Sequence, residues 1–130
     1  TCLEIIQQEP DLAGRLREVG TRFVSGLRDL GFNVPPTESA IVPVIFSSEE
    51  ETLDAVGFCR DHGLFVVPVF YPAVPIDKPR IRATVMASFD ERDIDEALAV
   101  FAKLADSGSR KVSLGKGGQE ICDLPSNLCC

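Results

Sequence analysis

The sequence is poor in the side chains on which metal and nucleic-acid sites depend. It has one histidine, His62, and none of its five cysteines belongs to a CxxC pair. This argues against a zinc site or a thioredoxin-like redox motif. Acidic residues outnumber basic ones 20 to 13, for a net charge of −7. A surface that binds nucleic acid needs the opposite balance or a dense basic stripe, so we expect no nucleic-acid partner.

Long apolar runs are also missing. No segment approaches the ~20 apolar residues that cross a bilayer, and no basic-then-apolar signal segment opens the chain. The cysteines are odd in number and irregularly spaced. We therefore expect no membrane span and a reducing, cytoplasmic location. His62 stands before Gly63 at the end of a predicted helix, where a histidine has an ordinary structural role.

The apolar residues that are present predict three helices. In residues 11–30 they recur in steps of three and four, which is one face of a helix that ends before Gly31. Ser48 and Glu51 have the spacing of a capping box at the start of a second helix over 49–62. Asp90 is a good N-cap for a third. The residues expected to face inward from the second and third helices are Leu53, Val56, Cys59, Ile94, Leu98, Phe101 and Leu104.

Three short apolar runs predict strands. The runs at 40–46 and 64–70 each contain a proline, and Pro43 indicates an edge or a bulge. Residues 79–87 alternate, with Ile81 on one face and both arginines of the RIR segment on the other. The order α-β-α-β-β-α predicts an α/β protein, more closely an α+β two-layer sandwich with helices on a small, mainly antiparallel three-stranded sheet. Residues 1–106 form this domain, and 107–130, without periodicity, are expected to be a flexible tail.

The segment YPAVP, followed by RIR and then by DERDIDEAL, resembles the aminotransferase-like C-terminal small domain of the α-oxoamine synthases. LRDLGFNV and DHGLFVVPVF stand in the same order, so the resemblance covers about residues 1–106. The family comprises fold-type I enzymes that use pyridoxal phosphate. Its members include 2-amino-3-ketobutyrate CoA ligase, to which the YPAVP wording is most similar, 8-amino-7-oxononanoate synthase, serine palmitoyltransferase and 5-aminolevulinate synthase.

The resemblance implies a fragment of an acyltransferase that condenses an amino acid with an acyl-CoA or another acyl thioester. Pyridoxal phosphate serves such enzymes as an electron sink. By the resemblance it is bound mainly by a large domain upstream, which carries the cofactor lysine. The resemblance implies that the chain begins in mid-helix without that domain, so we expect no cofactor in the isolated chain and no activity by itself. The full-length form is expected to be a homodimer.

The resemblance also assigns roles to single residues. Arg82, the second arginine of RIR, corresponds to the family's substrate-carboxylate arginine, and a planar guanidinium can hold a carboxylate with two hydrogen bonds. Tyr71 and Pro72 are expected to bind substrate at the mouth of the active site. Arg80 matches a variable, structural position, and Phe89 stands where the family usually has a histidine. From the pattern alone, an ordinary surface arginine in a salt bridge is the favoured interpretation of Arg82, because surface arginines are common.

A second hypothesis stays open at this point. The same order of elements is compatible with a stand-alone small α/β module that binds a ligand or regulates a partner without catalysis. The GKGG stretch at 115–118 adds nothing to either hypothesis, because it lacks the spacing of a phosphate-binding loop.

Overall fold

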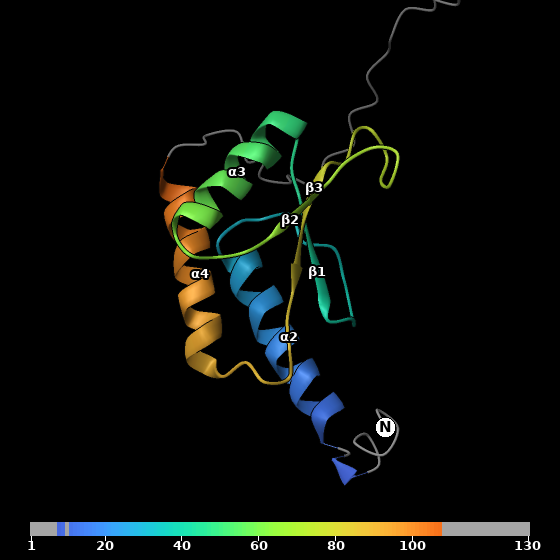
Figure 1. Cartoon of the computed structure of the whole chain (residues 1–130), viewed down its shortest axis with the longest axis vertical. Helices are drawn as coiled ribbons and strands as arrows, with labels where there is room; N and C mark the ends of the chain where they lie inside the picture. The colour runs from blue at the N-terminus through green and yellow to red at the C-terminus, as the bar shows by residue number, and fades with distance from the viewer. Residues whose placement is uncertain (1–7, 10, 108–130) are drawn as a thin grey trace, which may run out of the picture.

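In the part of the chain that the structure describes, three helices cover one face of a three-stranded antiparallel sheet (Figure 1). This computed structural model describes residues 8–9 and 11–107. The order of the elements confirms the predicted α-β-α-β-β-α fold and its two-layer class. Their bounds are α2 (Leu12–Asp29), β1 (Ile41–Ile45), α3 (Glu49–Asp61), β2 (Val67–Val69), β3 (Arg80–Thr84) and α4 (Glu91–Asp106).

The strand β3 is the centre of the sheet, and β1 and β2 are its edges. Both edge strands run antiparallel to β3. Each edge strand contains a proline, Pro43 in β1 and Pro68 in β2. Proline has no N–H to offer a further strand, so it suits an edge and discourages unwanted pairing there. The prediction that Pro43 marks an edge is confirmed.

The core lies between the sheet and the helices, and Phe101 of α4 is at its centre. Phe101 is 0% exposed. Its ring meets those of Phe23 and Phe32 edge-to-face, with centroids 6.0 and 5.3 Å apart, an arrangement that aromatic quadrupoles favour. The sheet contributes its helix-facing side chains, which include Val42, Val44 and Ile81, all fully buried.

The helix α3 differs from the prediction at one of its three expected inward positions. Leu53 is 54% exposed, so the prediction that it faces inward is wrong, whereas Val56 and Cys59 are buried as predicted. The buried stripe begins instead at Thr52 and continues through Ala55. Thr52 can be buried because its hydroxyl donates to the carbonyl oxygen of Ser48 at 2.8 Å, which satisfies the polar group.

The helix ends follow the predicted signals. The Ser48 hydroxyl accepts a hydrogen bond from the backbone N–H of Glu51 at 3.1 Å. The Asp90 carboxylate accepts one from the N–H of Asp93 at 3.0 Å, and the Asp93 carboxylate accepts one from the N–H of Asp90 at 2.9 Å. Gly63 has a φ of +80° just beyond α3, which only glycine adopts without strain.

Asp90→Ala is expected to lower the free energy of unfolding by about 1 kcal/mol, because α4 loses the acceptor at its first turn. Urea unfolding of the 130-residue chain followed by circular dichroism measures the change. Asp90→Asn keeps an acceptor and is expected to lose less, and Asp54→Ala, at an exposed site in α3, serves as the matched control. Equal losses for Asp90→Ala and Asp54→Ala would show that the cap contributes nothing.

Cys59 is a buried thiol of α3. Burial penalises the charged thiolate and raises the pKa of Cys59 to about 11. At pH 8 about one thiol in a thousand is then ionised, and only the thiolate is nucleophilic. We therefore expect slow alkylation by iodoacetamide in the native chain and fast alkylation in urea. Cys2, Cys122, Cys129 and Cys130 lie outside the described residues, so they are replaced by serine for this measurement. Equal native and urea rates would contradict the burial.

The predicted tail at 107–130 lies outside the described residues except for Ser107. Among the residues that the structure does describe, none of the helices has the length and apolar character needed to cross a membrane.

Candidate functional site

Arg82 lies in the central strand, on the face of the sheet that no helix covers. Its neighbours Ile81 and Ala83 are buried under the helices, whereas Arg82 is exposed. Figure 1 shows α2, α3 and α4 together on the other side of the sheet. The cross-strand partners of Arg82 are Pro43 of β1 and Val67 of β2. The guanidinium therefore stands on an open surface in the middle of the sheet.

The two arginines of RIR share this face but differ in what they bind. The Nε of Arg80 donates to the carbonyl oxygen of Lys78 at 3.2 Å, and Arg80 is half-buried. Within the described residues, Arg82 makes neither a side-chain hydrogen bond nor an ion pair. The sequences of the three strands, IVPVI, VPV and RIRAT, contain no acidic residue that could pair with it.

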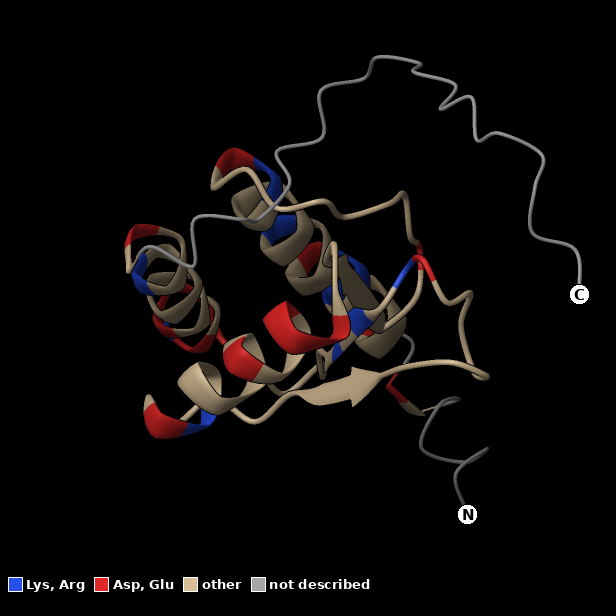
Figure 2. Ribbon diagram, turned by 90° about the horizontal axis from the view of Figure 1, so that it is seen from above, with Lys and Arg blue, Asp and Glu red and all other residues tan. Residues whose placement is uncertain are grey.

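Acidic residues are instead found along the helices, as Figure 2 shows. There Arg22 of α2 is bound to α4, with its guanidinium 3.0 Å from a carboxylate oxygen of Glu91 and 3.0 Å from one of Asp95. The hydrogen bond to Asp95 is the main cause of the raised pKa of Arg22. Arg22 is thus an ordinary salt-bridged surface arginine, whereas Arg82 has no salt-bridge partner among the described residues.

Tyr71 and Pro72 lie in the loop between β2 and β3. Both are exposed, Tyr71 by 65%, and the peptide bond between them is cis. The register pairs Val69, the last residue of β2, with Arg80, so the loop continues from the Arg80 end of the hairpin. Among the described residues, no hydrogen bond or ion pair links Tyr71 or Pro72 to Arg82.

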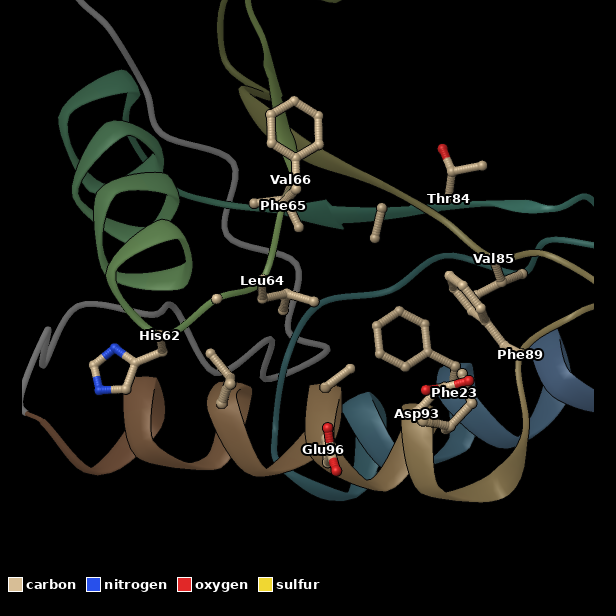
Figure 3. Close-up of a pocket in the computed structure, with 15 residues that line it drawn as sticks. Phe23, His62, Leu64, Phe65, Val66, Thr84, Val85, Phe89, Asp93 and Glu96 are labelled. Atoms are coloured by element: carbon tan, nitrogen blue, oxygen red, sulfur yellow. The ribbon is translucent and has the colours of Figure 1, made fainter.

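A cavity of about 240 Å³ lies between α4, the 62–66 segment and the end of β3, and Arg82 is not among the residues that line it (Figure 3). Phe89 and Phe23 lie at one end of it and His62 at the other, with the 62–66 segment along its wall. No sequence pattern predicted this cavity. Phe65 lines it and is 84% exposed, but it stands in a run that is apolar at every position, so the pattern did not mark it.

The described residues do not fit a site for pyridoxal phosphate. Both described lysines, Lys78 and Lys103, are exposed, and neither lines the cavity in Figure 3. A lysine that reacts with a carbonyl is normally desolvated in a pocket. The described residues also contain no group of three or more His, Cys, Asp or Glu side chains arranged to hold a metal ion.

Comparison with known proteins gives a consistent set of matches. The family model described as aminotransferase class I and II matches residues 3–101. An 8-amino-7-oxononanoate synthase of Symbiobacterium thermophilum is 37% identical over 103 residues, which are 79% of this chain and 26% of that protein. A Thermus thermophilus protein named both 8-amino-7-oxononanoate synthase and 2-amino-3-ketobutyrate coenzyme A ligase is 32% identical over 103 residues, with the same shares.

The solved structures give the same result. Serine palmitoyltransferase from S. paucimobilis, solved with bound pyridoxal phosphate and myriocin, superposes with a TM-score of 0.67 and 28% identity. The superposition covers 76% of this chain and 24% of that one. The chain thus spans about a quarter of the length of the relatives that it matches.

Proposed function

Because this chain belongs to the aminotransferase class I and II family, and within it to the pyridoxal-phosphate-dependent α-oxoamine synthases, we propose that it is the C-terminal small domain of an acyltransferase that condenses an amino acid with an acyl-CoA or another acyl thioester. The large domain of that enzyme holds the cofactor. The chain spans 26% of its curated relative, and its two described lysines are exposed, so both facts support a cofactor site elsewhere in the enzyme. The whole enzyme is proposed to be a homodimer.

The observation that carries the proposal is the open guanidinium of Arg82. A buried or paired arginine has already used its donors, whereas Arg82 has no partner among the described residues. Its five N–H donors form a planar fork that matches both oxygens of a carboxylate. We assign to it the α-carboxylate of the amino acid substrate. Pyridoxal phosphate supplies the electron sink for the reaction, and Arg82 holds and orients the amino acid beside it.

Tyr71 and Pro72 have a secondary place in this proposal. They are exposed in the loop that follows β2, and no hydrogen bond joins them to Arg82. They contact the substrate or the large domain only if the rest of the enzyme approaches this end of the hairpin. Arg80 is a structural residue that ties the end of the same loop to β3 through the Lys78 carbonyl.

The proposal is tested by expressing the chain with the sequence encoded upstream of it. Release of free CoA from an acyl-CoA is measured with glycine, L-alanine or L-serine, with and without added pyridoxal phosphate. We expect release that requires the cofactor and the upstream part, and none from the 130-residue chain alone. Equal release by the short chain, or none by the long protein with any of the three amino acids, would contradict the proposal.

A further inference from the structure

Arg82 lies between two side chains that cannot form hydrogen bonds. Residues directly opposite each other on neighbouring strands share a face, with Cβ atoms about 4.5–5.5 Å apart. The register places Pro43 on one side of Arg82 and Val67 on the other. Pro43 is half-buried and Val67 is 42% exposed. The stem of Arg82 therefore passes between two apolar walls before its charged end reaches the open surface.

Both walls are stiff. Proline has a closed ring, and valine, branched at Cβ, has few side-chain conformations open to it. The methylene groups of an arginine pack against such surfaces while the guanidinium stays in water. The walls limit sideways movement of the Arg82 stem, and they present no oxygen that would occupy its N–H groups. The guanidinium is left exposed, without a hydrogen-bond partner among the described residues.

We propose that Pro43 and Val67 are positioning residues for Arg82, and that they hold its guanidinium ready for the substrate carboxylate by supporting its stem without offering an acceptor. This inference rests on the function proposed for Arg82. It adds that the side chain at position 67 determines whether the guanidinium of Arg82 is free to bind the substrate carboxylate.

Val67→Glu tests the inference, because it introduces a carboxylate opposite Arg82. In the enzyme made of this chain and its upstream part, the new carboxylate competes with the substrate, and we expect the KM for the amino acid to rise at least about tenfold. The KM for the acyl-CoA and kcat are expected to change less than about threefold. Raising the salt from about 0.05 M to about 0.5 M should recover part of the loss, because salt screens an exposed ion pair.

Two matched variants separate charge capture from lost packing. Val67→Gln has the same size without the charge, and we expect a smaller rise in KM that does not respond to salt. Val69→Glu introduces the same carboxylate on the same face two residues away, opposite Arg80, and we expect the KM for the amino acid to stay within about twofold. Equal effects of Val67→Glu and Val67→Gln, or of Val67→Glu and Val69→Glu, would overturn the inference.

A measurement on the 130-residue chain separates this inference from the proposed function. The pKa of the carboxyl introduced by Val67→Glu, followed by NMR titration, should rise when Arg82→Gln is added, because the guanidinium opposite it favours the ionised carboxylate. If adding Arg82→Gln leaves that pKa unchanged, Arg82 is not held as inferred. If that pKa rises and Arg82→Ala raises the KM but Val67→Glu does not, only the inference fails. If Arg82→Ala leaves kcat/KM for the amino acid unchanged, the carboxylate-binding role proposed for Arg82 fails and the inference fails with it.

Discussion

Replacing Phe101 by alanine is expected to lower the free energy of unfolding by roughly 3–5 kcal/mol, the usual cost of truncating a fully buried phenylalanine. The side chain is 0% exposed and touches the rings of Phe23 and Phe32. These rings come from α2 and from the segment that follows it, so the cavity would open where the helices meet the sheet. Folded domains have only about 5–15 kcal/mol of stability in all, and this single change removes a large share.

Phe65→Ala is the matched control for this prediction. The same atoms are removed, but Phe65 is 84% exposed, so the expected change is within about 0.5 kcal/mol. Phe101→Leu keeps most of the volume and is expected to cost less than about 1.5 kcal/mol. Urea unfolding of the 130-residue chain at fixed pH measures all three. Similar midpoints for Phe101→Ala and Phe65→Ala would mean that α4 does not pack as described.

The sequence predicted those parts of the fold that depend on local physics. The spacing of apolar residues identified the core-facing position of Phe101. Capping side chains identified the cap at Asp90, and proline identified the edge strand of Pro43. The structure confirms each of them. Leu53 was wrongly predicted to face inward from α3 because Leu53 and Thr52 are adjacent on the helix, and hydrophobicity alone favours leucine. Thr52 takes the buried position through its bond to Ser48, which no hydropathy pattern contains.

The candidate site was only partly predictable for a related reason. Alternation places Arg80 and Arg82 on the same face of β3 and treats them alike. What distinguishes them is the position of the Lys78 carbonyl in the preceding loop, which accepts from Arg80 alone. The absence of acidic partners beside Arg82 also requires knowing that the acidic helices lie on the other face of the sheet, which is a property of the packed fold (Figures 1 and 2).

Arg82→Ala, in the enzyme that contains this chain, is expected to lower kcat/KM for the amino acid by about 10²–10³-fold. That corresponds to about 2.7–4 kcal/mol of transition-state stabilisation, the range for removing one hydrogen-bond donor to a charged group in an active site. The KM for the acyl-CoA is expected to change little, because the guanidinium is assigned to the amino acid. Steady-state assays of CoA release at varied amino acid and fixed acyl-CoA measure the effect.

The open surface around Arg82 makes this variant a clean test. Since Arg82 has no side-chain partner among the described residues, its loss should change the free energy of unfolding by less than about 0.5 kcal/mol. Arg80→Ala removes the same group two residues away and breaks the hydrogen bond to the Lys78 carbonyl. Because Arg80 is proposed to be structural, we expect this variant to lose stability and to lower kcat/KM only a few-fold. Arg82→Lys keeps the charge but not the planar fork, and should fall between Arg82 and Arg82→Ala. If Arg82→Ala and Arg80→Ala lower kcat/KM equally, the substrate carboxylate does not bind at Arg82 in particular, and the two arginines contribute alike to activity.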